Sequence, residues 1–180
     1  MIGFRLERDG TVSARFTGDE ASTLRDLAGQ LIVMLTDRAS AGDPVDAVLA
    51  AAGIGGAETP PLDPALARLL PDAYRDDPEA ASEHRRLTEH GLLQRKSDAA
   101  RAVVASLSDG DGTVPVRLDP PAVQAWLRTL TDLRLAIAAR LGIVEDGDPG
   151  RLEDDRDAAM HAVYQWLGAV QGMLLEVLDG

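Results

Sequence analysis

Three histidines are the side chains whose chemistry would be easiest to recognise. His84 and His90 are six residues apart, which on a helix places them on different faces rather than at the i, i+4 spacing of two metal ligands. His161 follows Asp157 by four residues and precedes Tyr164 by three, a spacing that can orient an imidazole for acid or base work. A hydrogen bond on a helix surface explains the same spacing. We favour that role and predict no catalytic residue and no metal ligand.

Two acidic stretches invite comparison with a calcium-binding loop. An EF-hand loop needs glycine at its sixth position and an oxygen ligand at its twelfth. Counted from Asp109, the sixth residue is Val114 and the twelfth is Pro120. Counted from Asp146, the sixth residue is Arg151. We therefore expect solvated turns, and the sequence predicts no cofactor.

One basic patch stands out between residues 85 and 101. It contains five cationic side chains against two carboxylates: Arg85, Arg86, Arg95, Lys96 and Arg101 against Glu89 and Asp98. The patch could contact a nucleic acid or the acidic surface of a protein. No aromatic residue is interleaved for base stacking, and a helix face of internal salt bridges explains the same charges. We keep the patch as a hypothesis for an interaction surface.

Arg134 falls near the centre of an apolar helical stripe, between Leu127 and Leu130 at 100° per residue. A buried charge needs a partner. Counting back from the connector, an antiparallel helix brings Tyr164 opposite Arg134, with Gln171 further along the same edge. We expect Arg134 to be at least mostly buried and bonded to Tyr164, Gln171 or nearby backbone carbonyls. A pocket for a small polar ligand remains open, but we favour a structural network that fixes helix register.

Composition narrows the classes of function. The chain has 180 residues, 45% of them hydrophobic, a formal charge of -12 and a pI near 4.6, which disfavours binding to phosphate backbones. It contains no cysteine, so disulfides and thiolate chemistry are excluded. The motifs of serine hydrolases, phosphate-binding loops and dinucleotide-binding folds are absent. No apolar run approaches the ~18 residues of a membrane-spanning helix, and we expect a cytoplasmic protein.

The strongest structural pattern lies in the last sixty residues. Apolar residues recur at three- and four-residue steps through 120–141 and again through 156–178, which predicts two long amphipathic helices. The connector 142–155 is acidic and rich in turn residues, so we expect an antiparallel helix pair that packs on a shared core.

The N-terminal region predicts a β-hairpin over 1–16. Ile2, Phe4 and Leu6 alternate with polar residues before the Asp9-Gly10 turn, and alternation resumes over 12–16. Residues 113–118 are the candidate third strand, which a proline confines to an edge. The expected fold is mainly α: a helical bundle with this hairpin, in one domain spanning 1–180.

The middle of the chain, 17–107, predicts further helices. They span 18–38, opened by a capping box, 44–52, 64–70, 79–87 and 92–107, with a flexible loop near 53–63 and a break near 88–91.

Three groups of residues carry a likeness to a known family: Arg85-Arg86-Leu87-Thr88-Glu89, Trp126-Leu127 with Asp132-Leu133-Arg134-Leu135, and Tyr164-Gln165-Trp166-Leu167 with Gln171. In this order they resemble an actinobacterial family of unknown function that is encoded beside the ClpS protease adaptor. Some of its members are named oxidative stress regulator AosR. The likeness covers nearly the whole chain. It implies a regulator of transcription that acts with RNA polymerase or a sigma factor, and no enzymatic activity.

These observations favour a non-enzymatic regulatory protein that works through contact with another protein. A DNA-binding regulator and an adaptor linked to Clp proteolysis are the alternatives, and homodimer formation is left open. The redox sensing that the family name suggests needs thiols, which this chain does not have.

Overall fold

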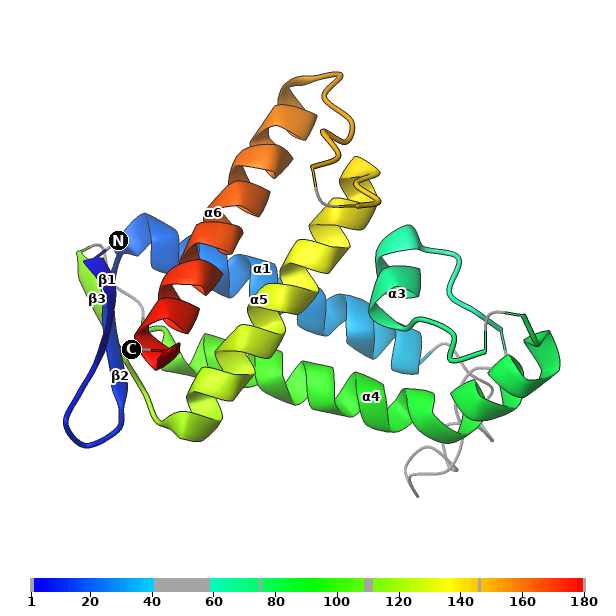
Figure 1. The fold of residues 1–180 in the computed structure, drawn as a ribbon, viewed down its shortest axis with the longest axis horizontal. Coiled ribbons are helices and arrows are strands. Elements are labelled where there is room, and N and C mark those ends of the chain that lie inside the picture. The colour runs from blue at the N-terminus through cyan, green and yellow to red at the C-terminus, as the bar shows by residue number, and fades with distance from the viewer. Residues whose placement is uncertain (1, 41–58, 75, 109–111, 146, 180) are drawn as a thin grey trace.

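A three-stranded antiparallel sheet lies at one end of the molecule, and helices extend away from it (Figure 1). The computed structural model describes residues 2–40, 59–74, 76–108, 112–145 and 147–179. The strands lie in the order β1 (Ile2–Leu6), β2 (Val12–Thr17) and β3 (Thr113–Leu118). The predicted hairpin and the edge position of the third strand are confirmed, because Pro115 lies in β3, which pairs with β2 and is an outer strand of the described sheet.

One face of the sheet packs on the helices through an aromatic cluster. Phe4, Phe16 and Trp126 bring their ring centroids to within 5.6–6.1 Å of one another. The Trp126 indole also donates a hydrogen bond to the hydroxyl of Ser106 at 3.0 Å, so its one polar atom is satisfied inside the core. Alternate residues of β2 and β3 complete this buried face: Val12, Ala14, Val114, Val116 and Leu118.

The helices largely follow the sequence patterns. They are α1 (Gly18–Ala39), α3 (Pro64–Leu69), α4 (Pro78–Ser106), α5 (Pro120–Leu141) and α6 (Asp155–Asp179). The capping box predicted at Thr17 and Glu20 is present, with both reciprocal hydrogen bonds. An aspartate caps the N-terminus of α3, α4 and α5, where its side chain accepts hydrogen bonds from backbone N–H groups of the first turn. Each of these helices then begins with proline. The helix expected over 44–52 lies outside the described residues.

The break predicted near 88–91 is wrong, because α4 runs without interruption through that region. The Thr88 hydroxyl donates to the carbonyl of His84 at 2.8 Å, so it bonds back within the helix instead of capping a new one. Gly91 keeps helical geometry, and α4 packs against both α1 and α5. Tertiary packing therefore overrides the weak helix propensity of this stretch.

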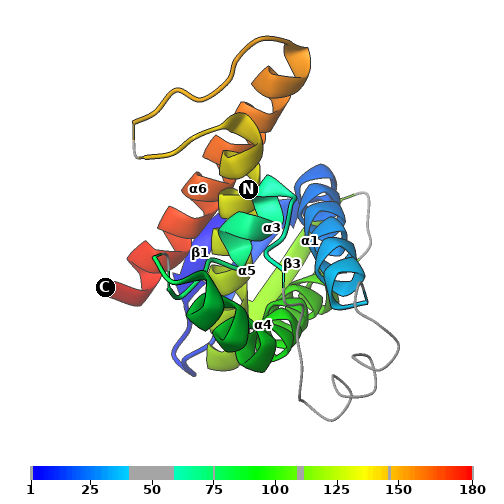
Figure 2. The same cartoon turned by 90° about the vertical axis from the view of Figure 1, so that its right-hand side faces the viewer.

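Helices α5 and α6 form the predicted antiparallel pair, and their connecting turn extends beyond the rest of the molecule (Figures 1 and 2). Gly142 ends α5 in the left-handed conformation at φ 72°. Gly150 has φ 61°, and a Cβ there would lie 2.6 Å from the side chain of Ile143 and 2.9 Å from the carbonyl of Leu141. Glycine is thus required where the connector folds back on the end of α5.

Candidate interaction surface

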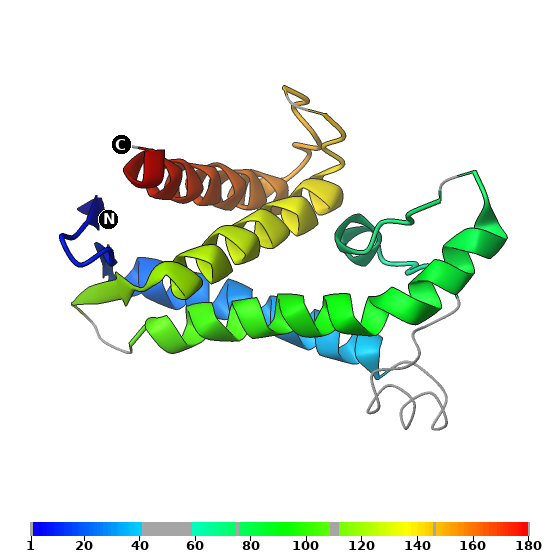
Figure 3. The same ribbon diagram turned by 60° about the horizontal axis from the view of Figure 1, so that its bottom comes forward.

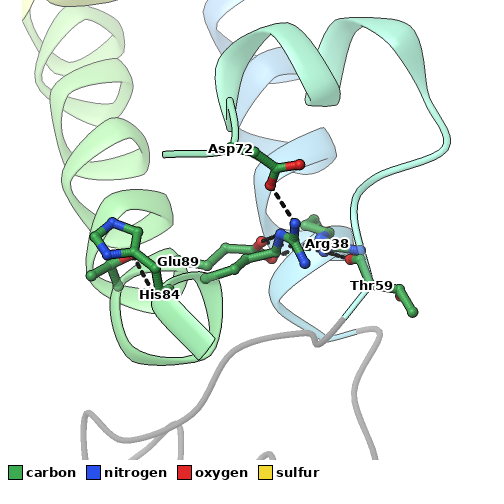
Figure 4. Close-up of polar contacts among 7 residues, drawn as sticks. Arg38, Thr59, Asp72, His84 and Glu89 are labelled. Carbon is green, nitrogen blue, oxygen red and sulfur yellow. Dashed lines mark hydrogen bonds and ion pairs between the residues drawn. The ribbon is translucent and has the colours of Figure 1, made fainter. Parts of the chain in front are cut away.

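The first arginine of the predicted basic patch lies inside the molecule. Arg85 is 8% exposed, pairs with Asp72 and lies 4.0 Å from Glu89. Glu89, only 3% exposed, accepts hydrogen bonds from Nε and Nη2 of Arg38 at 2.8 and 3.2 Å. Arg38 also donates to the carbonyl of Thr59 at 2.7 Å. Figure 4 shows Arg38, Asp72 and Glu89 converging from separate segments; we call Arg38, Asp72, Arg85 and Glu89 the buried charge cluster.

The buried charge cluster ties α4 to α1 and to the segments that flank α3. Arg85 and Glu89 are four residues apart on α4, so both side chains leave the same face of the helix. Arg85 and Glu89 are buried and Arg38 is only 11% exposed, so burial of these charges would be costly without their partners. The cluster therefore stabilises the arrangement of the helices and does not present its cations to another molecule.

Three arginines of the patch remain exposed, but they do not share one face. Arg86 and Arg95 are nine residues apart, which at 100° per residue places them on opposite sides of α4. Neither pairs with another described residue. Arg101 forms an exposed ion pair with Asp98 at 3.1 Å, a type of contact worth at most about 1 kcal/mol. The structure thus divides the predicted patch into separate surfaces.

Lys96 turns towards α5 and pairs with a buried carboxylate. Its Nζ donates to Oδ1 of Asp132 at 2.6 Å, and Asp132 is 4% exposed. Burial raises the pKa of the Asp132 carboxyl, and the hydrogen bond and charge of Lys96 oppose that shift. Next to this pair an open pocket of about 420 Å³ lies between α4 and α5, which pack against each other. In Figure 3 the yellow-green α5 rises at an angle away from the green α4.

The structure brings Arg134, Tyr164 and Gln171 together between α5 and α6. Arg134 is half-buried; it donates to the Gln171 side-chain oxygen at 2.8 Å and to the Tyr164 hydroxyl at 3.5 Å. Its guanidinium carbon also lies 5.1 Å from the centre of the Tyr164 ring. Gln171 in turn donates to the Thr131 hydroxyl at 2.8 Å, so the network bridges the two helices at several levels. Such a network fixes their register.

His161 and Asp157 hold the connector rather than forming a catalytic pair. The His161 ring nitrogen Nε2 lies 3.0 Å from the carbonyl of Arg151. Asp157 accepts hydrogen bonds from the Arg151 guanidinium at 2.9 and 3.1 Å, and this partner holds the pKa of the carboxyl below its usual value. The rings of His84 and Tyr74 pack in a T-shaped arrangement, with centroids 5.8 Å apart. Across the described part of the chain, no group of three or more histidine or acidic side chains is arranged around a metal-sized space.

A second hollow was not anticipated from the sequence. It is an apolar groove of about 1100 Å³ bordered by α1, α3, α5 and α6, and its lining includes Leu27, Met34, Leu66, Ile137, Met160 and Val163. Val33 and Leu62 also line it and are 59% and 99% exposed. Periodicity within one helix cannot predict a groove that four elements build together. None of the helices in the described ranges has the length and hydropathy needed to span a bilayer.

Comparison with known proteins places the chain in a family. The family described as "Domain of unknown function (DUF2017)" matches residues 1–178. This chain belongs to the DUF2017 family. The proteins named oxidative stress regulator AosR from Mycobacterium bovis and Mycobacterium tuberculosis are each 38% identical to it over 176 residues, which cover 89% of this chain and 79% of theirs.

A relative from Mycobacterium leprae is 33% identical over 174 residues, covering 88% of this DUF2017 chain and 78% of its own length. No solved structure matches the chain. The resemblance drawn from the sequence is therefore confirmed at the level of the family and of the name that its mycobacterial members carry.

Proposed function

We propose that this DUF2017 protein is a non-enzymatic regulator of stress-responsive transcription that acts by docking to RNA polymerase or a sigma factor. The name of its mycobacterial relatives supports a regulatory role. The observation that carries the docking step is a local excess of positive charge between α4 and α5. There, Arg95 and Arg128 are exposed on a chain whose formal charge is -12.

This charge arrangement favours an acidic protein surface over DNA. An acidic molecule repels the phosphate backbone over distances up to the Debye length, about 8 Å at physiological salt. A local pair of guanidinium groups can still steer an acidic partner into one orientation, and charges at the rim of an interface mainly set the association rate. The proposal therefore assigns α4 and α5 a recognition role and no chemistry.

Oxidant sensing through cysteine is not open to this chain, because it contains none. Within the proposal, the protein supplies the docking step.

Surface plasmon resonance with RNA polymerase and with individual sigma factors from the source organism tests this proposal. We expect the wild-type chain to bind one of them with an association rate that falls as salt rises. Arg95→Glu should lower that rate and flatten its dependence on salt. Arg86→Glu makes the same change in net charge on the opposite side of α4 and should have a much smaller effect.

Two outcomes would reject this function. One is nanomolar binding of the isolated protein to a specific DNA site near about 150 mM salt, which would establish the DNA-binding alternative. The other is an absence of binding to RNA polymerase and to every sigma factor tested.

A further inference from the structure

The pocket between α4 and α5 has a chemical character that neither helix shows alone. Its lining comes from three residues of α4 and four of α5: Leu92, Arg95 and Lys96, with Leu127, Arg128, Thr131 and Asp132. The α4 residues fall within four positions of one another and the α5 residues within five, so each set spans little more than one helical turn and lines one side of its helix. The basic patch found in the sequence lies wholly on α4. Arg128 of α5 joins Arg95 and Lys96 because the two helices pack against each other here.

Two of the three cations at the pocket are available to a ligand. Arg95 and Arg128 are exposed and make no ion pair or hydrogen bond with another described residue. Lys96, in contrast, is already held by Asp132 at 2.6 Å. The Arg95 guanidinium lies over Gly91, because a Cβ at that position would be 3.3 Å from Nη1 of Arg95. The available charge is therefore two guanidinium groups at the rim.

The wall below these guanidinium groups is mainly apolar. Leu92 and Leu127 are only partly buried and line the pocket from the two helices. Thr131 closes one side, with its hydroxyl donating to the carbonyl of Leu127 at 2.8 Å and accepting from Gln171. This hydroxyl is thus fixed by the network between α5 and α6. A site of this type combines an apolar anchor point with two charged donors that suit carboxylates.

We propose that this pocket binds an acidic segment of a protein partner, with an apolar side chain between Leu92 and Leu127 and flanking carboxylates on Arg95 and Arg128. The inference rests on the proposed docking function and names the chemistry of the partner. A nucleic acid suits the pocket poorly, because its described lining contains no aromatic side chain for base stacking and the chain as a whole is acidic.

A peptide assay tests the pocket without any natural partner. The probe is a fluorescein-labelled peptide of repeated Glu-Glu-Leu triplets, titrated with the full chain and followed by fluorescence polarisation at about 50 and 200 mM NaCl. Two matched peptides carry glutamine in place of glutamate or serine in place of leucine. We expect the Glu-Glu-Leu peptide to bind, and each matched peptide to bind about tenfold more weakly or worse.

Variants of the protein then locate the binding site. The double change Arg95→Glu with Arg128→Glu should weaken binding of the Glu-Glu-Leu peptide by about tenfold or more. Arg86→Glu with Arg101→Glu changes the net charge equally on the same helix but outside the pocket, and should cost about twofold or less. Thermal melting of each variant confirms that the fold is retained.

Three results would overturn the pocket proposal: no binding of the Glu-Glu-Leu peptide, equal loss in the two double variants, or equal binding of the serine peptide. Each can occur while RNA polymerase or a sigma factor still binds through another surface, so failure of the pocket is distinguishable from failure of the docking function. Conversely, peptide binding that depends on Arg95 and Arg128 would stand even if neither of those partners bound.

Discussion

Helix α4 carries two arginines ten residues apart whose surroundings are opposite. Arg85, near its start, is buried with Glu89 and Asp72 in the cluster that joins α4 to α1 and to the segments around α3. Arg95, in its second half, stays exposed beside a pocket shared with α5. In the sequence both belong to one basic patch. In the structure, the first holds the fold and the second is available to a partner.

The difference lies in the carboxylates that other elements supply. Asp72 follows α3, and Glu89 is shared with Arg38 of α1, so the cations near the start of α4 are neutralised by three-dimensional contacts. At the pocket, Asp132 of α5 reaches Lys96 and leaves its neighbour Arg95 without a described partner. A basic patch in a sequence therefore indicates an interaction surface only through those cations that have no carboxylate partner within the fold.

The largest loss of stability is expected from a change in the buried charge cluster. Glu89→Ala would leave two guanidinium groups buried without their shared carboxylate and should lower the free energy of unfolding by about 3–5 kcal/mol. Urea denaturation at pH 7 measures this loss. Glu83→Ala, an exposed change on the same helix, should stay within about 0.5 kcal/mol. Equal stability of the two variants would show that the cluster does not hold the fold.

A smaller loss is expected for Arg134→Ala, which removes the hydrogen bonds to Gln171 and Tyr164 between α5 and α6. Because Arg134 is only half-buried, we expect a decrease in unfolding free energy of about 1–3 kcal/mol. Arg128→Ala, on the same helix, is the matched control and should change it by less than about 0.5 kcal/mol. A melting temperature as high for Arg134→Ala as for this control would contradict a structural role for the network.

The Lys96–Asp132 pair should make the free energy of unfolding depend on pH. Burial raises the pKa of Asp132 in the folded state above its unfolded value of about 3.9, so the folded protein binds more protons in that interval. The stability of the wild type relative to Asp132→Asn should therefore fall as the pH rises from about 3.9 through the raised pKa, and then level off. Urea denaturation of both proteins at a series of pH values measures whether this relative stability falls or rises with pH. A relative stability that rises with pH would mean that Lys96 outweighs the effect of burial.

The smallest effect on stability is expected for the two exposed arginines at the pocket, Arg95 and Arg128. Arg95→Glu with Arg128→Glu removes no described contact, so each change should alter the unfolding free energy by no more than about 0.5 kcal/mol. Chemical denaturation beside the wild type measures it. If this double variant were destabilised as much as Glu89→Ala, the arginines at the pocket would stabilise the fold as the buried charge cluster does. The contrast between Arg85 and Arg95 would then be wrong.

The sequence predicted the helices, the helix cap and the hairpin better than it predicted the ion pairs between distant segments. The 120–141 helix, the capping box at Thr17 and the hairpin turn follow local rules of periodicity, capping and turn chemistry, and all are present. The break near 88–91 was wrong because a threonine that bonds back within the helix and a helical glycine resemble a helix boundary when read locally. The burial of Arg85 and the pairing of Lys96 depend on Asp72 and Asp132, which no local pattern connects to α4.

Nuclear magnetic resonance of the arginine Nε–H groups tests the division of α4 most directly, because it observes buried and exposed arginines in one sample. The full chain is titrated with the Glu-Glu-Leu peptide, after assignment by arginine-to-lysine variants. We predict that the signals of Arg95 and Arg128 shift as the peptide is added, while those of Arg38 and Arg85 stay in place. Shifts at Arg85 or Arg86 with none at Arg95 and Arg128 would contradict the account.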